Sequence, residues 1–152
     1  MAYSVYCREN TVVAGAAEYI FYIVNNGTNN VIISKMVVSA NVTATGTFEA
    51  YVDPVHVSGG DPTVPLNLNR TSSLTSNVLV WHARTTPLVL TVTDANELVC
   101  LKFQDGGGNA YVVEFWDALI LGNGDAIGGY VKGGTIADEF RVTILFYEIE
   151  QH

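Results

Sequence analysis

The chain has 152 residues, of which 49% are hydrophobic and 14% are charged, whereas an average soluble domain has about 25% charged residues. Its formal net charge is −8 with seven Lys and Arg residues, so it lacks the basic stripe that neutralises nucleic-acid phosphates. No apolar run approaches the roughly 20 residues of a membrane span, and residues 1–10 do not resemble a signal peptide. We expect one folded domain over residues 1–152, with no nucleic acid and no membrane as partner.

The first third of the chain predicts short strands. We expect an edge strand at Tyr3–Cys7, a buried strand at Glu18–Val24 and a returning strand at Val31–Ala40. The turn between the last two, Asn25–Asn30, contains Asn-Gly, which favours positive φ and a two-stranded hairpin. A half-exposed strand follows at Gly46–Asp53, because apolar and polar residues alternate there.

Loops and strands alternate in the middle of the chain. Residues Pro54–Pro65 predict a loop, and Leu66–Thr75 predict polar, irregular chain. Further strands are expected at Asn77–Ala83, Leu88–Thr93 and Glu97–Phe103.

The last third contains the strongest strand pattern. Two strands are expected at Ala110–Trp116 and Ala118–Leu121, one more at Ala126–Val131, and a single helical turn at Ile136–Glu139. In the final segment, Phe140–Ile149, alternate positions form a wholly apolar face, so we expect a central strand of a sheet. Eight to ten short strands with a turn every 8–12 residues or so predict an all-β, antiparallel sandwich or barrel.

No catalytic motif is present, so we expect no enzymatic activity, no cofactor and no metal. His82 follows Trp81 without a ligand at metal spacing, and His56 and His152 have no partner in the sequence either. Two enzymatic alternatives stay open: a pair of carboxylates for glycosidic cleavage, brought together from distant strands, and a cupin-like metal oxidase.

Two cysteines and two glycine-rich turns are further candidates for chemistry. Cys7 and Cys100 are interpreted as buried free thiols, with a disulfide as the alternative. The oxygen-rich turns Asp105–Asn109 and Gly122–Asp125 are typical of loops that tolerate positive φ, with calcium binding as the alternative.

Tyrosine occurs eight times, and tyrosine and tryptophan are favoured at protein interfaces. We place five tyrosines at solvent-side or interface positions: Tyr22, Tyr51, Tyr111, Tyr130 and Tyr147. The same aromatic residues would suit a sugar-binding groove, and ordinary core filling is the third interpretation.

Two parts of the chain resemble small virion proteins of tailed bacteriophages. Leu66–Ser73, followed by Leu74–Trp81, resembles the apolar-Asn-Leu-Asn-Arg-small-Ser segment of jelly-roll-like head decoration and tail-associated proteins. Ala118–Asp125 and the later Val142–Glu148 are similar to their apolar-Gly-acidic turn and terminal Phe-Tyr-Glu strand. The chain departs from that pattern in the glycine-broken stretch Gly128–Gly134.

The resemblance implies a jelly-roll-like, non-enzymatic virion protein, made in the host cytoplasm. It implies a capsid decoration (cement) protein that binds the major capsid protein, as a homo-oligomer for which a trimer suits the three-fold positions of a shell. An Arg in such a segment would donate hydrogen bonds to backbone carbonyls and lock a loop, or lie exposed without a fixed partner. The structural or interface candidates are Arg70, Asn67, Asn69, Trp81, Tyr51 and Trp116.

A different class of function also fits the composition. A carbohydrate- or receptor-binding sandwich of a phage tail fibre or tail tip would need an exposed aromatic platform flanked by Asn and Asp. Trp81, Trp116 and Tyr51 are the candidates for that platform.

Overall fold

The structure is a computed structural model that describes residues 2–12, 17–42, 45–69, 71–104, 107–132 and 138–149. Its first seven strands are β1 (Ala2–Val12), β2 (Ala17–Asn25), β3 (Asn30–Val42), β4 (Gly46–Val52), β5 (Val55–Gly59), β6 (Asp61–Thr63) and β7 (Leu66–Asn67). The others are β8 (Val78–His82), β9 (Leu88–Thr91), β10 (Glu97–Phe103), β11 (Gly107–Leu121), β12 (Ala126–Lys132) and β13 (Asp138–Ile149), with a short 3-10 helix at Asp94–Asn96. No helix within these ranges has the length and apolar character that crossing a bilayer requires.

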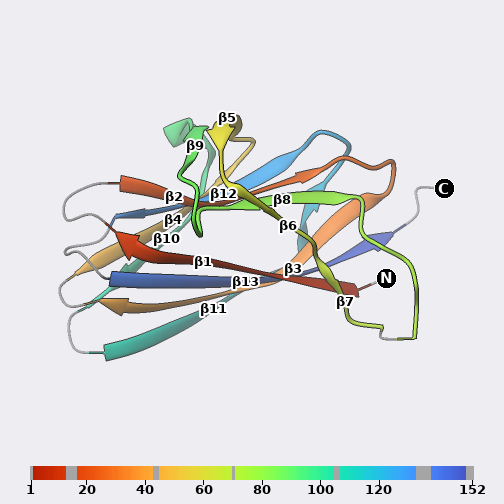
Figure 1. Ribbon diagram of the computed structural model, residues 1–152. Coiled ribbons are helices and arrows are strands. Elements are labelled where there is room, and N and C mark those ends of the chain that lie inside the picture. The colour runs from red at the N-terminus through yellow and green to blue at the C-terminus, as the bar shows by residue number, and fades with distance from the viewer. Residues whose placement is uncertain are drawn as a thin grey trace.

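Two antiparallel sheets face one another (Figure 1). Eight long strands form their frame, in the orders β11-β3-β13-β1 and β10-β4-β12-β2. If these strands are numbered one to eight along the chain, the sheets have the orders 6-3-8-1 and 5-4-7-2. That is the strand order of a jelly roll, in which most connections cross between the sheets. The predicted all-β antiparallel sandwich of jelly-roll type is therefore confirmed.

The final strand provides one side of the core, as its alternation predicts. The apolar face of β13, which comprises Phe140, Val142, Ile144 and Phe146, is buried, and β13 lies between β3 and β1. Phe103 of β10 and Phe140 of β13 join the two layers, with ring centroids 5.6 Å apart, edge to face. Within the larger sheet, the rings of Phe21 and Phe48 lie 6.4 Å apart. Burial of these large side chains is the main favourable term for the fold.

The predicted hairpin of β2 and β3 is wrong. β2 pairs with β12 and β8, whereas β3 pairs with β11 and β13 in the other sheet, so the turn between them bridges the two layers. The buried Asn25 holds this bridge, since its Nδ2 donates to the carbonyls of Asn29 (2.8 Å) and Leu121 (2.9 Å). Gly27 is not among the described residues with positive φ; a Cβ there would lie 2.7 Å from Cβ of Asn77. Close packing, and not turn conformation, therefore requires this glycine.

Residues 53–96 form an excursion between β4 and β10, and the predicted loop at Pro54–Pro65 contains two short strands. β6 adds to β8 at the edge of the larger sheet, and β7 adds to β1 at the edge of the smaller one. The strand predicted as an edge at Tyr3–Cys7 is thus the longer β1, covered by β13 and β7. β5, β6 and β7, of five, three and two residues, carry too little alternation to be recognised in the sequence.

Two predictions in the last third need correction. The segments Ala110–Trp116 and Ala118–Leu121 belong to one strand, β11, which contains a bulge. Asp138 and Glu139 begin β13 and are not helical, while 136–137 lie outside the described residues. The glycine-broken stretch that departs from the virion-protein pattern begins within β12, where Gly128 and Gly129 are buried. A Cβ on Gly128 would lie 2.8 Å from side-chain atoms of Leu90 and Pro54, and one on Gly129 would lie 2.3 Å from Cε1 of Phe21.

Candidate functional site

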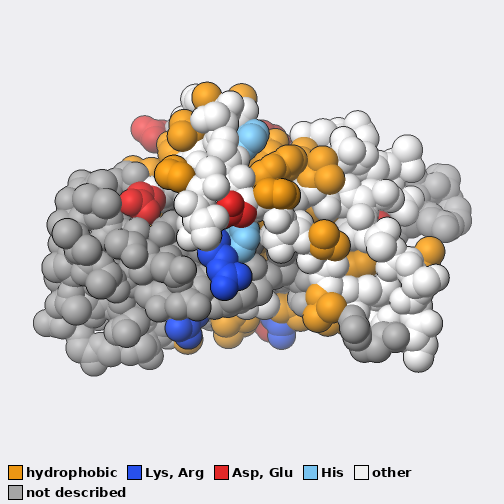
Figure 2. Space-filling model, in the orientation of Figure 1, with side chains coloured by type: hydrophobic (Ala, Val, Ile, Leu, Met, Phe, Trp, Pro, Cys, Tyr) orange, Lys and Arg blue, Asp and Glu red, His pale blue; other side chains and the backbone are white. Residues whose placement is uncertain are grey.

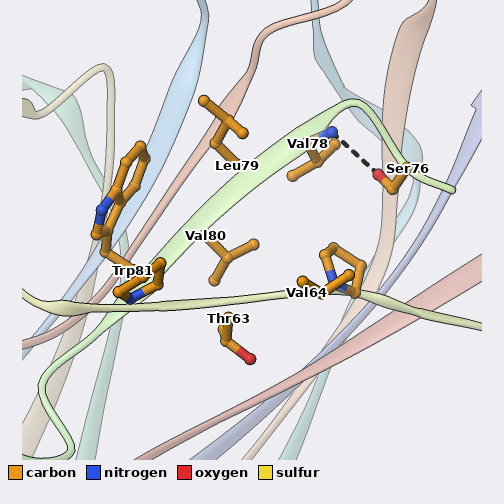
Figure 3. A pocket seen from close by; sticks show the side chains of 9 residues that line it. Thr63, Val64, Ser76, Val78, Leu79, Val80 and Trp81 are labelled. Atoms are coloured by element: carbon orange, nitrogen blue, oxygen red, sulfur yellow. Dashed lines mark hydrogen bonds between the residues drawn. The ribbon is translucent and has the colours of Figure 1, made fainter.

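An apolar groove of about 370 Å³ opens between β8 and the chain that precedes β7. Its lining comprises Pro62, Thr63, Val64, Pro65, Ser76, Val78, Leu79, Val80 and Trp81. Thr63 lies opposite Val80 in the β6–β8 ladder, and Figure 3 shows how Val64 and Leu79 flank the opening. The groove is thus built entirely by the excursion between β4 and β10, on a sheet edge.

Trp81 is held in place at one end of the groove. Its ring centroid lies 5.1 Å from that of His56 and 5.7 Å from that of Tyr22, and Tyr22 and His56 are themselves 5.3 Å apart. The three rings form a stack that fixes the indole as a wall of the groove. Burial, and secondarily the charge of Asp53, raise the pKa of Tyr22, so this phenol is uncharged at neutral pH.

Glu148 fixes the chain at the other end of the groove. Its Oε1 accepts a hydrogen bond from the Ser76 hydroxyl and another, of 3.0 Å, from the Asn77 amide. Ser76 Oγ in turn accepts the Val78 amide at 3.0 Å, as drawn in Figure 3. The two regions that carry the sequence resemblance, residues 66–81 and 142–148, therefore meet at this contact.

The predicted asparagines close the loop beside the groove and do not line it. Asn67 Nδ2 donates to the carbonyl of Leu74 at 2.8 Å, and Asn67 Oδ1 accepts the amide of Asn69 at 2.9 Å. Asn69 Oδ1 accepts both the amide and the hydroxyl of Thr71. These bonds give both residues a structural role. Arg70, predicted to lock the loop, lies outside the described residues.

Exposed aliphatic side chains extend the groove into a wider apolar surface. Val64, Leu66, Leu68, Leu74 and Leu79 are all exposed, Val64 to 77%. Figure 2 shows hydrophobic side chains gathered over β6, β7 and β8, with few charged groups among them. We refer to these five residues and the groove as the β6–β8 apolar surface. An exposed apolar patch of this kind marks an interaction site more often than a tolerated irregularity.

His82 lies beneath this surface and faces the interior. It is buried, and its Nδ1 has no hydrogen-bond partner in the part of the chain that the structure describes. Burial lowers the pKa of His82, with a smaller opposing effect from Asp61 and a lowering one from Arg84. The amides of Thr85 and Thr86 bind Asp61 and hold the pKa of its carboxyl far below the usual range. This arrangement fixes the loop after β8 and offers no exposed base.

The two remaining predicted aromatics lie elsewhere. Tyr51 was placed at an interface but is buried, 5% exposed, and its hydroxyl donates to Glu49 at 2.6 Å. Burial and then that bond raise the pKa of Tyr51 beyond its ordinary range. Trp116 is 84% exposed on β11, at the opposite end of the strand order from β7. The structure therefore separates Trp116 from the Trp81 groove.

Three ligand atoms of Glu49, Glu97 and Cys100 lie within 4.8 Å of one another. Cys100 was predicted to be buried but is exposed and free, because Val99 and Leu101 take the core-facing positions of the edge strand β10. Burial around its sulfur and the neighbouring Glu97 raise the pKa of Cys100, which disfavours the thiolate that binds metals. The side chain of Cys7 lies outside the described residues.

The turn at Gly122–Asp125 is explained by its own hydrogen bonds. Asp125 Oδ2 accepts the Gly122 amide at 2.8 Å, and Asn123 Nδ2 donates to the Gly27 carbonyl at 2.9 Å. Gly124 has a φ of 86°, as expected of a turn glycine. Residues 105 and 106 of the other glycine-rich turn lie outside the described residues.

Fold and surface together define a jelly-roll sandwich with an exposed apolar surface on an excursion at its edge. No protein-family model matches the chain, and no curated protein matches it. One solved structure, that of infectious bursal disease virus Gx strain, is similar over 96% of this chain and 38% of that chain, with 9% identity and a TM-score of 0.23. A TM-score this low does not show a common fold, so the jelly-roll assignment rests on the strand order.

Proposed function

We propose that this protein is a non-enzymatic structural component of a virion, and within that class a decoration (cement) protein of the capsid. The β6–β8 apolar surface is the observation that carries the proposal. An uncharged, aliphatic surface with one fixed indole suits a protein partner, because interface cores are depleted in charge and enriched in aromatic residues. The sequence resemblance of residues 66–81 points to the same class.

The partner would be the assembled major capsid protein, and the mechanism would be mass action. A ligand that binds only the assembled shell stabilises that shell by its binding free energy. A standard interface takes about 800 Å² from each partner, roughly a tenth of the 7711 Å² surface of this chain. Shell binding at the β6–β8 surface would thus leave ample area for contacts between copies, for which we propose a trimer made in the host cytoplasm.

Co-sedimentation with shells of the major capsid protein from the same virus tests this function. We expect the wild-type chain to pellet with shells, and Val64→Asp to remain in the supernatant, because it places a charge at the mouth of the groove. Val64 is 77% exposed, so the substitution leaves the fold intact. The matched control is Val112→Asp, at a 60% exposed position on β11, which should pellet like the wild type.

The result that would overturn the proposal is equally direct. A wild-type chain that stays in the supernatant at every shell concentration is not a decoration protein. Light scattering of the purified chain measures its mass in solution, and a monodisperse monomer of 16.4 kDa would refute the trimer.

A further inference from the structure

The bulge in β11 puts two consecutive residues in the left-handed region, which is strained for the first of them, a tryptophan. Trp116 and Asp117 have φ of 51° and 59°, in the left-handed region that side chains other than Gly, Asn and Asp rarely adopt. Glu114 pairs with Lys35 and Leu119 pairs with Ile33, so four residues of β11 face one residue of β3, Ser34. Such bulges re-aim side chains and occur next to functional sites.

The two residues in the bulge stay outside the core. Trp116 is 84% exposed, and Asp117 is exposed as well, whereas the neighbours Phe115 and Leu119 pack against the core. With regular alternation Phe115, Asp117 and Leu119 would share the core face, so the bulge keeps the Asp117 carboxylate at the surface. It does not require a bulky aromatic residue at position 116, where the left-handed conformation is costly and buries little of the indole.

What the bulge builds is a small polar cavity against the indole. Ser34, Glu114, Trp116 and Asp117 line a volume of about 190 Å³. The Tyr147 hydroxyl hydrogen-bonds the Asp117 carboxylate, which raises the pKa of Tyr147 and anchors the acidic side chain on the outer face of the sheet. Drug-sized ligands occupy pockets of about 300 Å³ or more, so this cavity suits a single ring.

We propose that the β11 bulge is a binding subsite for a neutral saccharide. A sugar ring presents one apolar face of C–H groups, which fits the flat face of Trp116, and a rim of hydroxyl groups. The carboxylates of Glu114 and Asp117 accept hydrogen bonds from hydroxyl donors, and the Ser34 hydroxyl both donates and accepts. A few convergent polar groups beside an aromatic wall are the usual composition of a ligand site.

Charge decides which saccharides the subsite takes. Glu114 and Asp117 outnumber the one cation paired beside them, Lys35 opposite Glu114 on β3, and the chain has a net charge of −8. The subsite therefore repels an anionic sugar, since like charges brought together cost binding free energy. We therefore expect neutral hexoses and N-acetylhexosamines to bind, and sialylated or uronate-containing glycans to be rejected. Saccharide binding goes beyond the shell binding proposed above. The β11 subsite lies at the edge of the smaller sheet that is opposite to β7, whereas the β6–β8 apolar surface lies at the β8–β6 edge of the larger sheet, so both surfaces can be occupied together.

A glycan array with the purified chain, followed by calorimetry on the best neutral oligosaccharide, tests the subsite. We expect Trp116→Ala to weaken binding at least tenfold. Asp117→Asn keeps a residue that tolerates the left-handed conformation and should weaken neutral glycans several-fold while reducing discrimination against sialylated ones. The matched control is Ile120→Ala, at a 50% exposed position on the same strand, which should bind like the wild type.

Four results would overturn the proposal. They are the absence of wild-type binding to any neutral glycan, unchanged binding by Trp116→Ala, a preference for sialylated glycans, and an oligomer that dissociates in Trp116→Ala without any glycan binding. The last result would mean that a second copy of the chain covers the indole. Circular dichroism of each variant shows whether the fold is kept, which we expect because Trp116 makes few contacts.

Discussion

Replacing Trp116 by glycine should stabilise the protein, although it removes a large aromatic residue. The left-handed conformation costs an ordinary residue about 1–2 kcal/mol, and glycine avoids this cost. Glycine also gains freedom in the unfolded chain, which offsets about 0.5–1 kcal/mol. Since the side chain is 84% exposed, its loss removes little buried area. The net expectation is about 0.5–1 kcal/mol of added stability, and a rise in Tm of about 1–4 °C for a chain of this size.

Urea denaturation followed by far-ultraviolet circular dichroism measures this difference. The matched control is Trp116→Ala, which removes the same ring but keeps a Cβ and therefore keeps the strain. We expect the glycine variant alone to gain stability. If the glycine variant loses 1 kcal/mol or more, packing of the indole holds the bulge. If the alanine variant gains as much as the glycine variant, the backbone conformation is not the source of the strain. Either result refutes the functional interpretation of the strain.

Three other substitutions test the fold, each by the same urea denaturation. Gly129→Ala should destabilise by about 1–3 kcal/mol, because its Cβ would lie 2.3 Å from Cε1 of the buried Phe21, and a loss below about 0.5 kcal/mol would contradict that contact. Asn25→Ala should cost about 1–3 kcal/mol, since it leaves the Leu121 carbonyl without its donor; a neutral result would show that water replaces the amide. Burial lowers the pKa of His82 in the folded state, whereas the unfolded chain binds its proton at about pH 6.5. Wild-type stability should therefore fall as pH drops below about 6.5, and His82→Phe should reduce that slope; identical slopes would refute the assignment.

Alternation in the sequence was sufficient to predict the class of fold. The period-two pattern of Phe140–Ile149 predicted a central strand, and the structure places β13 there. Strand partners were harder to predict, because a local turn signal does not distinguish a hairpin from a bridge between layers. Asn25–Asn30 shows this limit: the amide contacts that decide its geometry come from residues about 96 positions away along the chain.

The candidate sites were predicted only in part. Trp81 and Trp116 were both named from the sequence, and each belongs to a site in the structure, but nothing in the pattern showed that the two sites are separate. The sequence did not single out Glu114 and Asp117 as site residues, because the bulge that brings them beside Ser34 depends on the register of β11 against β3. The sequence contains only a weak indication that Val64 is exposed, namely that it is an apolar residue between two prolines in a predicted loop. The prediction for Tyr51 was wrong because a tyrosine can also face the interior of a sheet when its hydroxyl has a hydrogen-bond partner, here Glu49.

The excursion between β4 and β10 has a consequence for the sequence evolution of such a protein. Its five short strands lie at the margins of the eight-strand frame, and of them β8 adds Val78 and Val80 to the main core. A replacement at Val64 therefore touches no pairing of the frame strands, whereas Leu79 lies opposite Val24 of β2 and is constrained by that pairing. The chemistry of this margin can thus change in one peripheral segment while the two-sheet scaffold stays the same.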